Sequence, residues 1–197
     1  MGVERLQQEY TDGTRRVIAG VMDRATRIPV TANQVTVAGF LINVVAAVLV
    51  YREAFIAGGL VFLLGSILDI FDGAVARARG EAGPRGAIID SVLDRFSEAI
   101  MFVALALVFA REGNEVAVGA VIIALASSLL TSYLRAKAES LGLDGTHGLM
   151  ARAERVVLIA AALLFAPLGA LPWGIILLAI LSTITVLQRA RHVLHQL

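Results

Sequence analysis

The sequence contains no cysteine, so it can form neither disulfide bonds nor thiolate metal sites. Charged residues are also scarce, at 17% of the chain, against roughly 25% in soluble domains. Hydrophobic residues make up 58%, and the mean hydropathy is +0.80. One soluble core of 197 residues cannot bury this much apolar surface. A membrane protein is therefore predicted.

Six apolar runs approach the length of about 20 residues that a helix needs to cross a bilayer. We therefore expect an all-α, polytopic membrane protein with six transmembrane helices. Pro167, Gly169, Pro172 and Gly174 interrupt the last part of the chain, so its two runs form a hairpin and not one long helix. The predicted spans are Val35–Tyr51, Ala54–Ala76, Gly86–Ala110, Val116–Leu134, Arg155–Leu168 and Trp173–Gln188.

Basic residues lie almost entirely at one end of these predicted spans. With six spans both termini share that end, which takes all but two, Arg52 and Arg111, of the 17 Lys and Arg residues. The positive-inside rule then places both termini, and the acidic groups described below, on the cytoplasmic side of a cell membrane.

Apolar residues recur at helical spacing before the first span, from Val17 to Ile28, and arginines lie largely between them. This pattern predicts a helix on the cytoplasmic membrane surface, and a soluble cap on the helix bundle is the alternative. We expect residues 1–32 to form a cytoplasmic segment that carries this amphipathic helix. Residues 33–197 are expected to form the six-helix transmembrane domain.

Four aspartates lie in and beside the second and third predicted spans. Asp69 and Asp72 share one face of a helix, and Asp90 and Asp94 share a face of the next. Residues 77–85 between them include two glycines and a proline and are expected to form a turn, so the two acidic faces can meet.

An unpaired aspartate at the centre of a transmembrane helix costs roughly 2.5–3.5 kcal/mol to insert. Four such groups must therefore face a hydrated cavity or pair with cations. Carboxylate oxygens suit Mg²⁺ or Mn²⁺, and four of them can hold two metal ions about 3.5–4 Å apart.

The spacing of these acids and of the small residues near them resembles the signature of the CDP-alcohol phosphotransferases, with every fixed position filled. The resemblance covers nearly the whole chain. It implies a membrane enzyme that transfers a substituted phosphate from a CDP-alcohol to a hydroxyl acceptor and releases CMP. The matching residues are Asp69-x-x-Asp72-Gly73-x-x-Ala76-Arg77 and, after eight further residues, Gly86-x-x-x-Asp90-x-x-x-Asp94.

The resemblance also implies roles for individual residues. Two divalent metal ions, Mg²⁺ or Mn²⁺, would bind to the four aspartates, and Asp94 would also be the general base. Asn33 and Thr36 lie in a segment similar to the family's sequence before the first span, although Ala32 stands where proline is common. The implied nucleotide-binding residues are Gly73, Ala76, Arg77, Asn33 and Thr36.

Basic side chains in the second half of the chain are expected to gather at the cytoplasmic end. Several guanidinium groups together commonly bind a phosphate, whereas the alternative is that they anchor helix ends beside anionic headgroups. The segment from Ser132 to Glu139 and the Glu154–Arg155 pair resemble a branch of the family that makes phosphatidylinositol phosphate. The implied acceptor phosphate-binding residues are Ser132, Arg135, Arg152, Arg155 and Arg189, with Lys137 a weaker candidate.

Members of that branch take CDP-diacylglycerol as donor and inositol 1-phosphate as acceptor, and archaeal relatives use an ether-lipid donor. Two alternatives remain open. Phosphatidylglycerol phosphate synthases share the aspartate motif and take glycerol 3-phosphate. An ion-coupled transporter would explain the intramembrane acids but not the spacing of Gly73 and Arg77. We also expect the lipid bilayer and a second copy of the chain as partners, and no nucleic acid.

Overall fold

The computed structural model describes residues 31–79 and 83–197, and the side chains of Ala32 and of residues 70–79 lie outside this description. The described residues form helices and no strand, so the expected all-α class is confirmed for this part of the chain. Six long helices coincide with the six predicted spans. They are α2 (Ala32–Tyr51), α3 (Phe55–Arg79), α4 (Pro84–Arg111), α5 (Glu115–Ser140), α6 (Arg152–Leu164) and α7 (Leu171–Leu194), with a short 3-10 helix η1 (Ala166–Leu168).

Helix α2 begins three residues before the predicted span because Thr31 caps it. The Thr31 hydroxyl accepts a hydrogen bond from the backbone amide of Gln34, and the Gln34 side chain accepts one from the backbone amide of Thr31. This reciprocal arrangement is a capping box, which satisfies amides that the first turn leaves without partners.

Two helix ends differ from the predicted spans. Helix α5 continues to Ser140, beyond the predicted end at Leu134, and Arg135 and Glu139 on this extension form an i,i+4 ion pair. The fifth predicted span breaks after Leu164, because Pro167 lacks the amide that a continuing helix would need.

Length and composition identify three helices of the described residues as able to cross a membrane: Asn33–Tyr51, Glu115–Ser140 and Leu171–Leu194. A shorter apolar stretch runs from Phe55 to Asp69. For the other predicted spans, which are short or carry charged residues, crossing of the membrane stays a prediction. The predicted surface helix before Ile28 lies outside the described residues.

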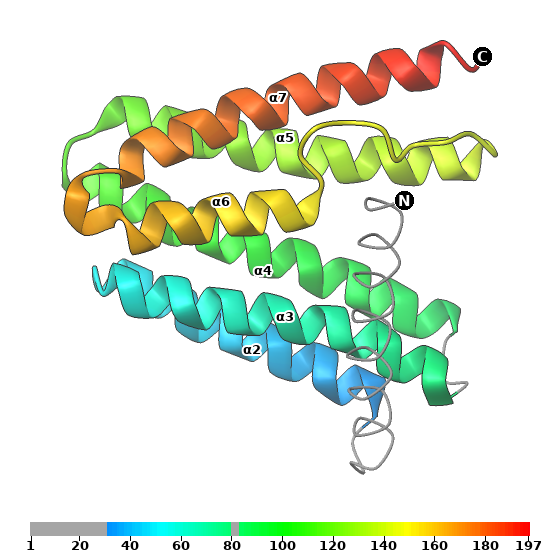
Figure 1. The fold of residues 1–197 in the computed structure, drawn as a ribbon, viewed down its shortest axis with the longest axis horizontal. Helices are drawn as coiled ribbons and strands as arrows, with labels where there is room; N and C mark the ends of the chain where they lie inside the picture. Colours follow the sequence, from blue (N-terminus) through cyan, green and yellow to red (C-terminus); the bar gives the residue numbers. More distant parts are fainter. Residues whose placement is uncertain (1–30, 80–82) are drawn as a thin grey trace, which may run out of the picture.

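The six long helices form a ring around a common interior. Contacts between helices follow the order α2, α3, α6, α7, α5, α4 and back to α2. Figure 1 shows the first residues of α2, α4 and α6 and the last residues of α3, α5 and α7 at one end of this bundle. The acid-bearing helices α3 and α4 are both neighbours of α2 and face each other across the interior.

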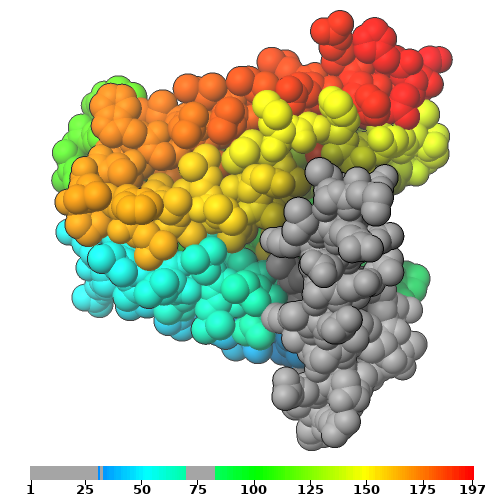
Figure 2. Space-filling model, viewed as in Figure 1, coloured from blue at the N-terminus to red at the C-terminus, as the bar shows by residue number. Residues whose placement is uncertain are grey.

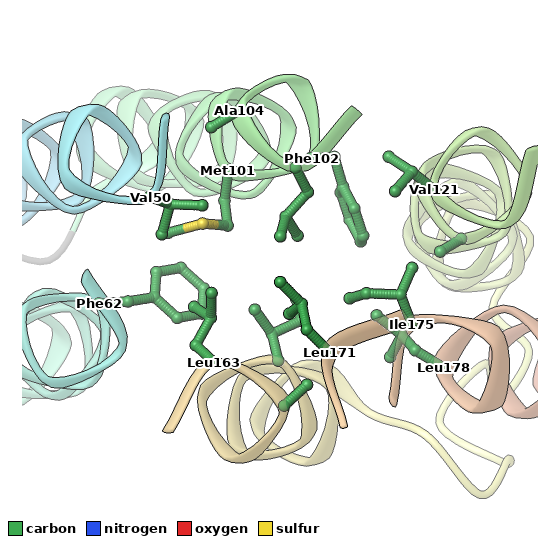
Figure 3. Close-up of a cluster of buried hydrophobic side chains, with 14 of the residues drawn as sticks. Val50, Phe62, Met101, Phe102, Ala104, Val121, Leu163, Leu171, Ile175 and Leu178 are labelled. Carbon is green, nitrogen blue, oxygen red and sulfur yellow. The ribbon is translucent and has the colours of Figure 1, made fainter. Parts of the chain in front are cut away.

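Apolar side chains from all six helices fill the middle of the ring. Figure 3 shows Val50, Phe62, Met101, Leu163 and Ile175 among those that point inward. Other large apolar side chains lie on the outer surface of the helices, where a bilayer would cover them. On the face shown in Figure 2, the side chains of α3, α6 and α7 close the spaces between their ribbons.

Replacing Phe102 tests this interior packing. Phe102 is fully buried, whereas its neighbour Val103 is 53% exposed on the outside of α4. Phe102→Ala should lower the free energy of unfolding by roughly 3–5 kcal/mol, because it leaves a cavity among well-packed side chains. Denaturation in detergent micelles, with Val103→Ala as the matched control, measures the difference. Equal losses for the two variants would contradict the described interior.

Candidate active site

A cavity of about 400 Å³ lies between α4, α5, α6 and α7, at the end of the bundle where α6 begins. Its walls are polar and bear an unusual number of charged groups for a chain this apolar. Five arginines and four carboxylates line it. The arginines are Arg95, Arg135, Arg152, Arg155 and Arg189, and the carboxylates are Asp90, Asp94, Glu98 and Glu139.

Two of the predicted metal-binding acids meet at one guanidinium group. Arg152 Nη2 lies 2.8 Å from Asp69 Oδ2, and Arg152 Nη1 lies 2.8 Å from Asp94 Oδ1. Asp69 comes from α3 and Asp94 from α4, so the two helices that face each other across the ring direct carboxylates toward a common cation. The first residue of α6 supplies that cation.

Of the remaining two acids, Asp90 and Asp72, the structure describes the side chain of Asp90 alone. Asp90 lies one turn before Asp94 on α4 and lines the same cavity. Asp72 lies on α3, but its side chain is outside the described part of the structure. Among the side chains that are described, no group of three or more His, Cys, Asp or Glu is arranged to hold a metal ion. The two-metal site thus stays a prediction.

The structure likewise describes the side chains of only some predicted nucleotide-binding residues. Gly73, Ala76 and Arg77 lie on α3 in the stretch whose side chains are not described. Asn33 and Thr36 lie on the first turns of α2, with Asn33 exposed and Thr36 buried.

Helix α2 packs closely against both acid-bearing helices at this end. A Cβ atom added to Gly39 would overlap the Asp69 carboxylate, and one added to Gly86 would lie 3.6 Å from Asn33 Oδ1. Gly39 lies three residues after Thr36, on the buried side of α2, and the sequence analysis did not single it out. Its small size lets α2 come into contact with Asp69 on α3, and on another side of α2 Asn33 lies beside the first turn of α4.

The predicted acceptor residues Ser132, Arg135, Arg152, Arg155 and Arg189 all line the one cavity. Lys137, the weaker candidate, is exposed and is not among the lining residues that the structure describes. The arginines differ in how firmly they are held.

Arg135 is the least restrained of these arginines. Its Nε donates a 2.8 Å hydrogen bond to Glu139, and both side chains are about half exposed to solvent. Exposed ion pairs of this kind are worth about 0–1 kcal/mol. Arg135 can therefore exchange Glu139 for another anion at little cost.

Arg189 is buried and connects α7 to the loop between α5 and α6. Its Nε donates to His147 O at 2.9 Å, its Nη1 to Thr131 O at 2.8 Å and its Nη2 to Thr146 O at 3.3 Å. In the same loop the hydroxyl and backbone amide of Thr146 donate to Asp144 and hold the pKa of that carboxyl below its usual value. These bonds hold Arg189, which lines the cavity, against the backbone of α5 and of this loop.

Sequence reasoning missed Glu98, which lies one turn beyond Asp94 on the same face of α4. Its carboxylate accepts hydrogen bonds from Arg155 Nε at 2.7 Å and Arg155 Nη2 at 3.1 Å. The Ser128 hydroxyl donates a third bond at 2.7 Å. The available signal was the spacing of Asp90, Asp94 and Glu98, which continues the acidic face by one further turn.

A polar cavity bounded by acids and arginines, in a ring of apolar helices, is typical of an enzyme that handles phosphate compounds at a membrane. Residues 29–187 match the CDP-alcohol phosphatidyltransferase family. The chain therefore belongs to the CDP-alcohol phosphatidyltransferase family, and it is a phosphotransferase enzyme of phospholipid biosynthesis. Of the classes that the sequence left open, this membership selects the enzyme over the transporter.

Individual relatives give a more detailed comparison. The chain is 38% identical to an archaetidylinositol phosphate synthase from Pyrococcus horikoshii over 162 aligned residues. The alignment covers 81% of each chain. It is 33% identical to the enzyme of the same name from Methanothermobacter thermautotrophicus over 198 aligned residues. This alignment covers 98% of this chain and 97% of the other.

Solved structures of Mycobacterium tuberculosis phosphatidylinositol phosphate synthase have a similar fold at 31% identity. The structure with bound CDP-DAG gives a TM-score of 0.82 and covers 90% of this chain and 94% of the other. The structure in complex with manganese and citrate gives a TM-score of 0.79 and covers 90% of this chain and 88% of the other.

Removing the Arg189 guanidinium tests whether it fixes the loop. In Arg189→Met, backbone amides of residues 142–150 should exchange with solvent about 10-fold faster or more, because hydrogen bonds to a charged donor are worth roughly 1.5–3 kcal/mol each. Hydrogen exchange followed by mass spectrometry measures this. Arg191→Met is the matched control, since Arg191 is exposed on the same helix and contacts His195. Unchanged exchange in the Arg189 variant would refute the role.

Proposed function

We propose that this enzyme transfers a phosphatidyl group from CDP-diacylglycerol, or the corresponding group of an ether-lipid donor, to inositol 1-phosphate. The products are phosphatidylinositol phosphate, or its ether-lipid counterpart, and CMP. The observation that carries the proposal is the cavity in which Asp90 and Asp94 lie beside arginines from four helices. The names of the archaeal relatives and the CDP-DAG complex of the M. tuberculosis enzyme support the same substrates.

The acceptor's phosphate fits the basic side of this cavity. A phosphate monoester carries about −1.5 to −2 charges at neutral pH and offers three strong acceptor oxygens. Guanidinium groups match it because they present parallel N–H donors. In this proposal the acceptor's phosphate binds to Ser132, Arg135, Arg152, Arg155 and Arg189.

The acidic side of the cavity fits divalent metal ions. Asp69 and Asp94 already direct oxygens toward a shared cation, Arg152, and carboxylates are hard oxygen ligands. We propose that the four aspartates, Asp69, Asp72, Asp90 and Asp94, hold two Mg²⁺ or Mn²⁺ ions. The manganese complex of the M. tuberculosis enzyme supports this. Such ions supply positive charge that stabilises the donor's diphosphate and the departing phosphate.

The donor's nucleotide would bind at the adjoining ends of α2 and α3. In this proposal the small residues Gly73 and Ala76 would leave room for it, and Arg77 would supply a cation for the diphosphate. Asn33 and Thr36 would add polar contacts from α2. With the donor held there, its phosphatidyl phosphorus would lie close to the acceptor's cavity.

Asp94 is proposed as the general base, because it shares Arg152 with Asp69 and also lines the cavity proposed for the acceptor. It would take the proton from the inositol hydroxyl as the oxygen attacks the phosphatidyl phosphorus. The new phosphodiester bond forms as the phosphoanhydride bond breaks, and CMP leaves with the electron pair.

The arrangement in the membrane is part of the same proposal. All six long helices would cross the bilayer, with both termini and the active site on the cytoplasmic side. Residues 1–32 would form a cytoplasmic segment with a surface helix, and residues 33–197 the transmembrane domain. By family resemblance the enzyme would work as a homodimer.

A comparison of acceptors tests the proposed reaction. With CDP-diacylglycerol and Mg²⁺, inositol 1-phosphate should release CMP with a kcat/KM at least roughly 10-fold above that of glycerol 3-phosphate, because a site made for the inositol hydroxyls loses bonds with the smaller acceptor. Chelation of divalent metals should abolish CMP release. If the enzyme prefers glycerol 3-phosphate, that compound and not inositol 1-phosphate is the acceptor, since both offer the same phosphate to the arginines.

Substitution of Asp94 tests the general base. Asp94→Asn should lower kcat about 10²- to 10⁴-fold at saturating Mg²⁺, because the amide cannot accept the acceptor's proton. Asp144→Asn is the control, since Asp144 is an exposed loop residue whose amide replacement can still accept the Thr146 hydrogen bonds. If Asp94→Asn kept most of its activity with metal bound, another group would have to be the base.

A further inference from the structure

Glu98 is a buried acid at the floor of the cavity that the proposed reaction does not use. Its side chain is 8% exposed, and that of its partner Arg155 is 3% exposed. The carboxylate receives three hydrogen bonds, two from Arg155 on α6 and one from Ser128 on α5. Three helices therefore meet at one carboxylate.

A buried ion pair of this kind is poor evidence for stability, because the cost of removing two charges from water can exceed the attraction between them. Apolar side chains would join α4, α5 and α6 as well. The pair does fix the orientation of the Arg155 guanidinium, since two N–H groups of this planar group are bound to one carboxylate.

The hydrogen bonds of Arg155 leave part of its guanidinium free. An arginine has five N–H donors, and here Nε and Nη2 each use one on Glu98, while Nη1 uses one on Met150 O at 3.3 Å. One N–H on each terminal nitrogen remains. Arg155 lines the cavity, so this end of the guanidinium is the part that can meet a ligand there.

The other cavity arginines are held differently. Arg135 has an exposed partner, Glu139, and Arg152 is one-third exposed between Asp69 and Asp94. Arg135 can reorient when a ligand arrives, whereas Arg152 is shared between the two acids. Arg155 has one fixed orientation, because Glu98 accepts two of its N–H groups and is itself held by Ser128. A group that is fixed before binding loses less conformational freedom on binding.

We propose that Glu98 is a positioning residue for the acceptor: it directs the free end of Arg155 at the acceptor's phosphate. This inference rests on the proposed function, which assigns the cavity to a phosphorylated acceptor. Ser128 completes the arrangement by holding the second oxygen of Glu98. Neither residue touches the acceptor itself.

The test is kinetic analysis of Glu98→Gln, which keeps the shape of the side chain but presents an amide to Arg155. The KM for the phosphorylated acceptor should rise roughly 10- to 100-fold, the range expected when a hydrogen bond to a charged group is lost. The kcat and the KM for CDP-diacylglycerol should change less than about 2-fold, since the donor binds elsewhere. Glu115→Gln, an exposed acid at the far end of α5, is the control.

A double-mutant cycle shows whether Glu98 acts through Arg155. If it does, Glu98→Gln combined with Arg155→Gln should give the same acceptor KM as Arg155→Gln alone. Multiplied effects would mean that Glu98 acts independently and would overturn the proposal. So would equal increases in the KM of donor and acceptor, which a purely structural pair would produce. If Glu98→Gln does not fold, Ser128→Ala, which keeps both charges, should raise the acceptor KM selectively.

Inorganic phosphate separates this inference from the proposed function. Phosphate should raise the Tm of the detergent-solubilised wild type, and Glu98→Gln should need about 10-fold more phosphate or more for the same rise in Tm. This readout needs neither donor nor turnover, so it holds whichever acceptor the enzyme uses. Equal phosphate responses in wild type and variant would refute the positioning role. Turnover with glycerol 3-phosphate alone would change only the proposed acceptor.

Discussion

The pairing of Arg152 with Asp69 and Asp94 is the interaction on which the site depends. It takes place inside a ring of apolar helices, where an uncompensated charge is expensive. The two acids come from helices that are not consecutive in the ring, and the arginine is the first residue of a third. Charges that would each disfavour burial are therefore stable together. In the proposed function, metal ions would take the place of Arg152 beside the two acids, and a phosphate would take the place of the acids beside Arg152.

Around that centre the basic groups differ in freedom. Arg135 is exposed, Arg152 is shared between two acids, and Arg155 and Arg189 are buried with several partners each. In the proposed function, the fixed donors would define where the acceptor's phosphate sits, and the less restrained Arg135 would close around it. The glycine at position 39 contributes from the opposite side, because it lets α2 approach the acid on α3.

The sequence predicted the helices and the face of α4 that Asp90 and Asp94 share, because both follow from local periodicity. Apolar runs locate the six helices, and i,i+4 spacing places Asp90 and Asp94 on one face. It could not predict the order of helices in the ring, since packing between distant segments decides that. For the same reason it missed the partners of the buried arginines: Glu98 lies 57 residues from Arg155 in the chain. The prolines and glycines after α6 predicted the break before Pro167, but the helix that ends there has only 13 residues.

That length affects how two unlike substrates can meet. Helix α6 has 13 residues and is about 20 Å long, at 1.5 Å per residue, while the hydrocarbon core of a bilayer is about 30 Å thick. Its first turn, with Arg152 and Arg155, therefore begins below the level that its longer neighbours reach. The cavity lies where this short helix begins, in the recess beside its longer neighbours. Under the proposed function, a soluble sugar phosphate would enter this recess and meet the phosphates of the lipid donor there, while the lipid tails stayed in the bilayer.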